Sequence, residues 1–275
     1  MYNDGYALGV ATMGHSLSKV KSQARKIAIY IPERISEGIL CRVRAMGWEL
    51  LPVDRIPPPH NGEGIWTGFV DQYTKLRIWT LDQLGIKSAV YLDADILVLK
   101  NFDELFDLPF VFAAAPDVFL NRRGFTVSFN AGVMAVKPNS EVFKDMLSKL
   151  EDAKFSRKGA EQSYLNLYYA SQLVRLPHVY NGNLAIKAKS RSYWAAMQEQ
   201  MRTIHYTLAK PFDRGPWCGD KPCEGSDGSE VFDISRQEGP LEYAKAFLDG
   251  AFREEIERWI VERDEMMLAL GNSCA

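Results

Sequence analysis

Two aspartates, Asp93 and Asp95, follow directly after the apolar run Ala89–Leu92. In an open α/β sheet, ligands bind beyond the carboxyl ends of the strands, so a strand ending at Leu92 delivers both carboxylates to that edge. Two carboxylates one residue apart need a counter-charge when they are buried. Hard cations such as Mg²⁺ and Mn²⁺ take oxygen ligands and bridge to phosphates. The pair therefore predicts a metal and diphosphate site.

An isolated Asp-x-Asp is a weak pattern, because aspartate also favours turns. Phosphatases of the haloacid dehalogenase class also place Asp-x-Asp after an apolar strand, with the first aspartate as nucleophile. In that class the motif lies near the N-terminus, whereas here it begins at residue 93 and is followed by Ile96. No later apolar strand ends in the acidic pair that those enzymes use for Mg²⁺. A phosphatase is therefore the weaker interpretation.

The segments around the pair alternate between helical and strand patterns. Helices are expected at residues 6–19, 36–46 and 71–84, and strands at 26–31, 49–53 and 88–92. The stretch 55–68 is rich in proline and glycine and is expected to be a loop. Alternating strands and helices with short connections predict a parallel sheet with helices on both faces.

After residue 96 the pattern is less regular. Strands are expected at residues 110–115, 127–136 and 203–206, and helices at 140–151 and 160–169, with 181–235 mostly irregular. The region 241–270 is amphipathic, and its apolar stripe includes Phe252, Ile256 and Trp259. This stripe is expected to pack on the core, and a homodimer contact is the alternative.

Composition and charge exclude several classes of function. The 275 residues carry 33 basic and 35 acidic side chains, which is not the footprint of a nucleic-acid binder. No apolar run approaches the roughly 20 residues that span a bilayer. No basic leader precedes an apolar core at the N-terminus, so a cytoplasmic location is expected.

Four cysteines are too few for a disulfide scaffold in a chain of this size. Cys41 is expected to act as a small apolar residue of a helix. Cys218 and Cys223 share a loop and are expected to pair, bind a metal or remain as reduced thiols.

Several ordered motifs accompany the aspartate pair. They are Asn3-Asp4-Gly5-Tyr6 with Gly9, Gly14, Ser16 and Leu17; Thr74-Lys75-Leu76 with Trp79; the run Val90–Phe106; Asn130-Ala131-Gly132; Glu161-Gln162; and His205 ahead of Lys210-Pro211-Phe212. In this order the chain resembles glycosyltransferase family 8, and within it the glycogenin-like enzymes, over about residues 2–212. The run Val90–Phe106 is the most specific part of the resemblance.

The resemblance implies a fold, a domain organisation and an activity. The fold is α/β, a nucleotide-sugar-binding Rossmann-like single domain of the GT-A type, with a mixed, mostly parallel central sheet and a helical C-terminus. Residues 1–212 would form the catalytic domain, and residues 213–275 a loop and amphipathic helices packing on the same domain. The activity is transfer of glucose or galactose from a UDP-sugar to an acceptor hydroxyl with retention, which gives an α-linkage.

The resemblance also implies a role for each matched residue. Asp93, Asp95 and His205 would bind Mn²⁺ or Mg²⁺, while Asn3 and Tyr6 would hold the uracil and ribose. Glu161 and Gln162 near the sugar, together with Lys210 on the leaving diphosphate, are the expected catalytic residues. The donor-binding set that it implies is Asn3, Tyr6, Lys75, Asp93, Ala94, Asp95, Asn130, Ala131, Gly132 and Lys210.

The chain departs from the family pattern at several positions. The first strand is nearly absent, because Met1 and Tyr2 abut Asn3. Glu161 replaces an aspartate, and Ala131 replaces a serine. The self-glucosylated tyrosine of the glycogenins has no secure counterpart, so a separate acceptor is expected: a glycan, a glycoprotein or a polyol. The alternative is a catalytically impaired pseudoenzyme or scaffold that binds a nucleotide-sugar.

Overall fold

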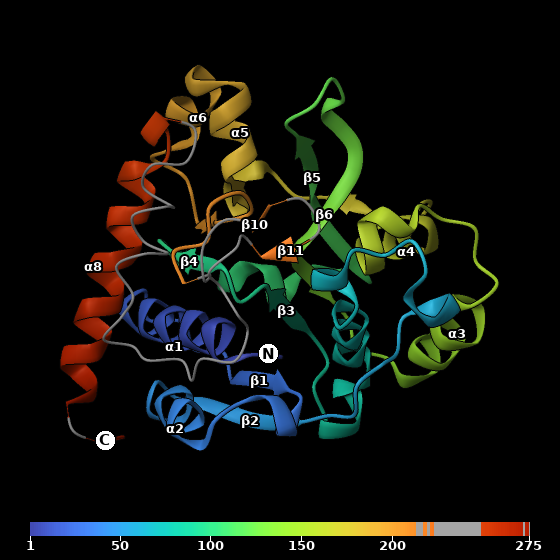
Figure 1. Ribbon diagram of the computed structural model, residues 1–275, viewed down its shortest axis with the longest axis horizontal. Coiled ribbons are helices and arrows are strands. Elements are labelled where there is room, and N and C mark those ends of the chain that lie inside the picture. The colour runs from blue at the N-terminus through green and yellow to red at the C-terminus, as the bar shows by residue number, and fades with distance from the viewer. Residues whose placement is uncertain (213–216, 219–220, 223–248, 272, 275) are drawn as a thin grey trace. The chain divides into compact units, whose positions relative to one another are not determined.

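The computed structural model describes residues 1–212, 217–218, 221–222, 249–271 and 273–274 (Figure 1). Contacts between residues divide the chain into two compact units. Unit 1 comprises Met1–Pro52, Ala94–Asn101 and Asn181–Ala275, and unit 2 comprises Val53–Asp93 and Phe102–Tyr180. The chain therefore leaves unit 2 and enters unit 1 between Asp93 and Ala94. The assignment of residues 1–212 to one catalytic domain stays a prediction.

Unit 1 contains helices at its N-terminal and C-terminal ends, with short strands and two short helices between them. Its elements are α1 (Asp4–Lys19), β1 (Lys26–Tyr30), η1 (Pro32–Arg34), α2 (Glu37–Ala45), β2 (Trp48–Pro52), β4 (Ile96–Val98), β8 (Gly182–Asn183), α5 (Leu184–Lys189), α6 (Arg191–Met197), β9 (Thr203–His205), β10 (Trp217–Cys218), β11 (Lys221–Pro222) and α8 (Arg253–Leu270). Strands β1 and β2 are parallel, as are β8 and β9, whereas β4 and β9 are antiparallel, as are β10 and β11.

Helix α1 begins at a capping residue. The side chain of Asn3 accepts a hydrogen bond from the backbone N–H of Tyr6, which satisfies one of the free donors of the first turn. Asp4 in the first turn and Lys19 in the last turn have the charges that suit the helix dipole. The helix buries an apolar face that includes Leu8 and Leu17.

Met1 lies beside β1. Its ammonium group donates to the carbonyl of Ile29 at 2.6 Å, and its carbonyl accepts from the N–H of Ile31 at 3.1 Å. Bonds to two residues that flank a central one are the pattern of a parallel pair. The strand that the sequence analysis expects to be nearly absent is thus represented by one paired residue.

Gly9 allows α1 to approach a neighbouring backbone within unit 1. A Cβ at this position would lie under 3.0 Å from the carbonyl oxygen of Ala94 and 2.8 Å from Cε1 of Phe212. Gly9→Ala is therefore expected to lower the free energy of unfolding by about 1–3 kcal/mol, because backbone must move to make room. The measurement is urea unfolding followed by circular dichroism.

Gly38 in α2 provides the matched control, because a Cβ there would meet nothing within 4 Å. Gly38→Ala is expected to leave stability unchanged or to raise it by less than about 1 kcal/mol. Equal effects at the two glycines would contradict the close approach at Gly9.

Helix α8 packs against α1 and crosses it (Figure 1). Phe252, Ile256 and Trp259 are fully buried, which confirms core packing for this part of the stripe. The hydroxyl of Tyr206 donates to the carbonyl of Glu255 at 2.7 Å, so α8 also supports the residue that follows His205. The part of the stripe at residues 241–248 lies outside the described residues.

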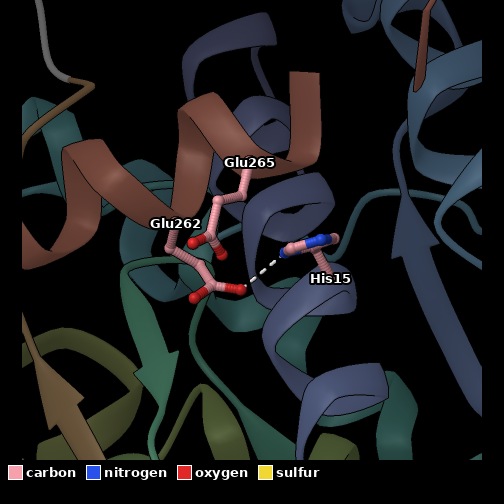
Figure 2. Close-up of side chains that lie close together, drawn as sticks. All are labelled: His15, Glu262 and Glu265. Carbon is pink, nitrogen blue, oxygen red and sulfur yellow. Dashed lines mark hydrogen bonds and ion pairs between the residues drawn. The ribbon is translucent and has the colours of Figure 1, made fainter. Parts of the chain in front are cut away.

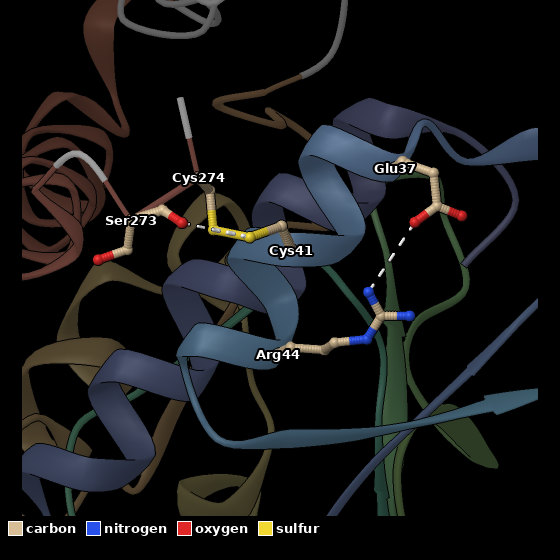
Figure 3. The surroundings of a disulfide bond; sticks show 5 residues. All are labelled: Glu37, Cys41, Arg44, Ser273 and Cys274. Carbon is tan, nitrogen blue, oxygen red and sulfur yellow. Dashed lines mark hydrogen bonds and ion pairs between the residues drawn. A yellow bond between two sulfur atoms is a disulfide. The ribbon is translucent and has the colours of Figure 1, made fainter.

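A disulfide joins Cys41 in α2 to Cys274, beyond the end of α8 (Figure 3). The two Cα atoms are 5.8 Å apart, although 233 positions separate the residues in sequence. The interpretation of Cys41 as an unpaired apolar residue is therefore wrong, since spacing alone does not reveal so distant a partner. Cys223 lies outside the described residues, so the state of Cys218 and Cys223 stays a prediction.

Unit 2 is built around a four-stranded sheet with the order β3-β6-β5-β7. Its elements are η2 (Pro59–Gly62), η3 (Thr67–Phe69), η4 (Gln72–Leu84), β3 (Ala89–Leu92), η5 (Asp103–Asp107), β5 (Phe112–Phe119), β6 (Gly124–Val136), α3 (Ser140–Leu150), η6 (Arg157–Gly159), α4 (Ala160–Tyr168), β7 (Val174–Arg175) and η7 (His178–Tyr180). In its core the rings of Trp79, Phe112 and Tyr169 stack on one another.

Two details of the expected fold are wrong. The sheets are mixed, but not mostly parallel: β6 is antiparallel to both β3 and β5, and β4 is antiparallel to β9. Because β5 and β6 are consecutive and joined by residues 120–123, they pair as a hairpin. Helices α5 and α6 were not expected, because both are short and interrupted at Ser190.

The helices and strands that the sequence analysis expects up to residue 212 lie close to their expected ranges, whereas the short strands β4, β7 and β8 have no counterpart among them. Among the helices that the structure describes, none combines the length and apolar character that crossing a bilayer requires.

Candidate active site

In unit 2, the side chain of Lys75 is buried between two carboxylates. Its Nζ lies 2.7 Å from Oε1 of Glu161 and 3.1 Å from Oδ1 of Asp93, and it donates to the carbonyl of Ala131 at 3.3 Å. Glu161 is 1% exposed, and the amide of Gln72, in the orientation that satisfies both groups, donates to its other oxygen at 2.8 Å. The fold thus assembles one ammonium group and two carboxylates from η4, α4 and the end of β3.

The pKa values in this cluster follow from burial and charge. Burial alone lowers the pKa of Lys75, but the charges of Asp93 and Glu161 outweigh it and hold the pKa above its usual value. Burial raises the pKa of Glu161, and the positive charge of Lys75 only partly opposes this. Lys75 is therefore a permanently charged centre.

Asp117, in β5, accepts hydrogen bonds from two side-chain amides that in turn bind the backbone of the predicted donor-binding residues Ala131 and Gly132. Its two carboxylate oxygens accept from Nδ2 of Asn130 at 3.1 Å and from Nε2 of Gln162 at 2.9 Å. In turn, the amide oxygen of Gln162 accepts from the N–H of Ala131, and that of Asn130 accepts from the N–H of Gly132. Asp117 is 4% exposed, so this carboxylate fixes both amides in a buried network.

Asp93 has two further partners in unit 2. The hydroxyl of Tyr91 donates to its Oδ1 at 2.7 Å, and the backbone N–H of Asp93 donates to the carbonyl of Gly132 at 2.8 Å. Tyr91 also presents its ring to Lys75, whose Nζ lies 5.1 Å from the ring centroid. The sequence analysis missed Tyr91, although alternation along the strand places it on the same side as Asp93.

In unit 1, Asp95 is buried between His205 and Lys210. Its Oδ1 lies 3.3 Å from Nε2 of His205, and its Oδ2 is paired with Nζ of Lys210. Asp95 and His205 are each 3% exposed. Burial raises the pKa of Asp95, but the charges of Lys210 and His205 outweigh it, so this pKa lies well below its usual value.

Strand pairing brings these residues together. Strands β4 and β9 are antiparallel with Ile96 opposite His205, and Asp95 immediately precedes Ile96. The carbonyl of Asp95 accepts from the N–H of Tyr206 at 2.9 Å, which extends the ladder by one bond. The backbone register of β4 against β9 therefore places Asp95 beside His205.

Tyr6 lies next to this cluster in unit 1. Its ring contacts Tyr2 and the edge of Phe212, and Nζ of Lys210 lies 5.6 Å from its centroid. Asn3 uses its side-chain oxygen to cap α1. The predicted contacts of Asn3 and Tyr6 with a nucleoside stay predictions.

The predicted site residues thus form two groups, one in each unit. Unit 2 holds Lys75, Asp93, Asn130, Ala131, Gly132, Glu161 and Gln162, and unit 1 holds Asn3, Tyr6, Ala94, Asp95, His205 and Lys210. In unit 1, a carboxylate and an imidazole offer the oxygen and nitrogen ligands that Mn²⁺ accepts, beside an ammonium group suited to phosphate. The donor set therefore fits a divalent cation. The role of Asp93, two residues before Asp95 in sequence, as a third metal ligand stays a prediction.

A second group of metal-type ligands lies in unit 1, where Glu262 and Glu265 of α8 face His15 of α1 (Figure 2). Nδ1 of His15 lies 2.6 Å from Oε1 of Glu262. Nζ of Lys19 contacts Glu262 at 2.9 Å and Glu265 at 2.5 Å. Because the ammonium of Lys19 already provides the cation for both carboxylates, this group fastens α8 to α1.

Known proteins match this chain over most of its length. The family model Glycosyl transferase family 8 matches residues 1–215. Glycogenin of Neurospora crassa is 30% identical over 220 residues, which cover 78% of this chain and 31% of the glycogenin. Inositol phosphorylceramide glucuronosyltransferase 1 of Arabidopsis thaliana is 27% identical and covers 78% of this chain and 41% of its own length. This chain thus spans well under half the length of both proteins.

Two solved structures share the fold. The galactosyltransferase LgtC, in complex with donor and acceptor sugar analogues, aligns with a TM-score of 0.55 at 20% identity and covers 77% of this chain and 87% of its own. The glycosyltransferase GlyE of Streptococcus pneumoniae TIGR4, in its apo form, aligns with a TM-score of 0.54 at 18% identity. The alignment covers 94% of this chain and 60% of the GlyE chain. These likenesses confirm the predicted α/β fold of the GT-A type.

Proposed function

Because the chain belongs to glycosyl transferase family 8 and is similar to glycogenin within it, we propose that it transfers a hexose from a UDP-sugar to an acceptor hydroxyl. The observation that carries this proposal is the buried group of Asp95, His205 and Lys210 in unit 1. Such a group of one carboxylate, one imidazole and one ammonium suits a cation together with a diphosphate.

Asp93, Asp95 and His205 would hold Mn²⁺ or Mg²⁺. When bound, the cation supplies Lewis-acid stabilisation of the departing diphosphate. Lys210 adds a second, fixed positive charge at that position, and its ammonium is already directed to Asp95. Tyr6 and Asn3 would contact the nucleoside. Ala94 contributes its backbone between the two aspartates.

The unit 2 residues would bind the hexose. Lys75 supplies a permanent positive charge, and the Asp117 network fixes Gln162 and the backbone of Asn130, Ala131 and Gly132. These groups would orient sugar hydroxyls, with Glu161 and Gln162 nearest to the reacting carbon. We propose retention of configuration, which gives an α-linkage, because the resemblance to the family implies it.

Retention has two routes, and the state of Glu161 favours one. Double displacement needs a free carboxylate at the anomeric carbon. Glu161 is buried, and its two carboxylate oxygens are bound by Lys75 and by the amide of Gln72, so neither oxygen is free to attack. The route that we propose is therefore attack by the acceptor hydroxyl on the face from which the diphosphate departs: the new bond forms as the bond to the diphosphate breaks, and the hydroxyl proton passes to a donor phosphate oxygen. Glu161 is then a positioning residue.

The donor is proposed to be UDP-glucose or UDP-galactose, and the acceptor a glycan, a glycoprotein or a polyol. A homodimer stays a prediction, and the buried residues Phe252, Ile256 and Trp259 are not available for its contact. A cytoplasmic location also stays a prediction, against which the Cys41–Cys274 disulfide weighs, because disulfides persist mainly in oxidising compartments.

Asp95→Asn tests the proposed activity. Release of UDP from UDP-glucose or UDP-galactose with Mn²⁺ is expected to fall by about 100-fold to 1,000-fold, because the charge facing His205 and Lys210 is lost. Removal of the metal with EDTA is expected to abolish turnover in the unaltered protein, and added Mn²⁺ to restore it.

The matched control is Asp264→Asn, which alters an exposed carboxylate of α8 and is expected to keep full activity. Turnover by Asp95→Asn at the level of the unaltered protein would refute the assignment. Binding of UDP and Mn²⁺ without any turnover would instead identify the catalytically impaired nucleotide-sugar binder.

A further inference from the structure

Asn181 makes a direct contact with the imidazole of His205. Its Oδ1 lies 2.9 Å from Nδ1 of His205, and the two residues are 1% and 3% exposed. A carboxamide oxygen accepts but does not donate, so this contact favours a proton on Nδ1. The other nitrogen, Nε2, lies 3.3 Å from Oδ1 of Asp95, which is close enough for one cation to bind both atoms in place of a proton on Nε2.

The backbone next to Asn181 is shaped to allow this contact. Strand β8 pairs in parallel with β9, with Gly182 opposite Ile204 and Asn183 opposite His205. A Cβ at Gly182 would lie under 3.0 Å from the carbonyl of Thr203 and 2.8 Å from Sδ of Met201. Only glycine therefore lets β8 lie this close to β9 without displacement.

The side chain of Asn183 is also polar and buried, but it makes different contacts from that of Asn181. Its Oδ1 accepts from the N–H of Ala185 at 2.8 Å, which caps α5, and from the hydroxyl of Thr207 at 2.7 Å. The two asparagines thus differ in the residues that their side chains contact. The side chain of Asn181 contacts His205, whereas the contacts of Asn183 stabilise α5 and the segment after β9.

We propose that Asn181 is a positioning residue for the metal: it holds His205 in the Nδ1–H tautomer and directs Nε2 toward the cation. This inference rests on the proposed function. Residues that accept the second N–H of a metal-binding histidine fix its tautomer and ring orientation, and their loss costs about 10-fold to 100-fold in metal affinity. Asn181 contributes no ligand atom of its own.

The test measures Mn²⁺ affinity of the full chain by electron paramagnetic resonance, through the signal of free Mn²⁺, without substrate. Asn181→Leu keeps the volume but removes the acceptor, and is expected to raise the Kd for Mn²⁺ by about 10-fold to 100-fold. Asn181→Asp restores an acceptor oxygen and is expected to bind Mn²⁺ within a few-fold of the unaltered protein. Asn183→Leu is expected to lower the Tm but to leave the Kd for Mn²⁺ unchanged.

The outcomes separate this inference from the activity on which it rests. Failure of the unaltered protein to bind Mn²⁺, with or without UDP, would overturn the metal site itself. Binding that is unaffected by Asn181→Leu, or weakened equally by Asn183→Leu, would overturn only the positioning role. If Asn181→Leu does not fold, ¹⁵N resonances of His205 in the unaltered protein with Mg²⁺ decide: a protonated Nε2 overturns the proposal.

Discussion

Lys75→Met is expected to lower the free energy of unfolding by about 3–5 kcal/mol, because it leaves a buried carboxylate without its counter-charge. The side chain of Lys75 is 6% exposed and that of Glu161 is 2% exposed, so water does not replace the lost contact. Asp93 loses less, since its side chain is 28% exposed and keeps the hydroxyl of Tyr91. Urea unfolding of the purified variant gives the measurement.

A double variant separates the charge from the packing. Lys75→Met combined with Glu161→Gln removes both buried charges, and is expected to recover most of the stability that the single change loses. The exposed pair of Lys149 and Asp145, four residues apart on α3, serves as the control. Lys149→Met is expected to cost less than about 1 kcal/mol. Equal losses for Lys75→Met alone and for the double variant would contradict the buried charge as the cause.

Reduction of the Cys41–Cys274 disulfide is expected to lower the free energy of unfolding by about 2–5 kcal/mol. The bond closes a loop with a sequence separation of 233, which includes all of unit 2. In the chain-entropy account, so long a loop restricts the unfolded chain strongly, and the folded state gains in comparison. The measurement compares urea unfolding with and without a phosphine reductant.

The variant Cys41→Ser, Cys274→Ser isolates this bond from the other two cysteines. It is expected to unfold at the urea concentration of the reduced protein, and added reductant is expected to shift it no further. If the reductant does not change the urea midpoint of the unaltered protein, the disulfide does not stabilise the fold, and the prediction is contradicted. A further shift in the variant would be assigned to Cys218 and Cys223.

The parts of the site that the sequence predicts are those that local patterns determine. The short apolar run Ala89–Leu92 predicts a strand, and a strand end predicts the position of Asp93. His205 and Lys210 became candidates through the ordered family motifs, because a single histidine and a single lysine carry no local signal. The fold adds the reason for the proximity of His205 to Asp95, which is the register of β4 against β9.

The other contacts of the site depend on how segments that are distant in sequence meet in the fold. Asp117 and Asn181 are isolated polar residues in sequence, and only the tertiary fold brings them to Gln162 and His205. Lys75 and Glu161 were each expected to contact the donor, whereas their contact with each other depends on how η4 and α4 meet. The family resemblance implies a mostly parallel sheet, whereas β5 and β6 follow each other directly in the chain and therefore pair as an antiparallel hairpin.

The bond between Cys41 and Cys274 also makes a covalent ring of everything between these two residues. A protease that cuts the ring once opens it but releases no fragment. Such a molecule migrates as one species under non-reducing conditions and as two pieces after reduction. α2 and the chain end beyond α8 therefore remain joined in a nicked protein, and the groups that fasten α8 to α1 keep their high effective concentration.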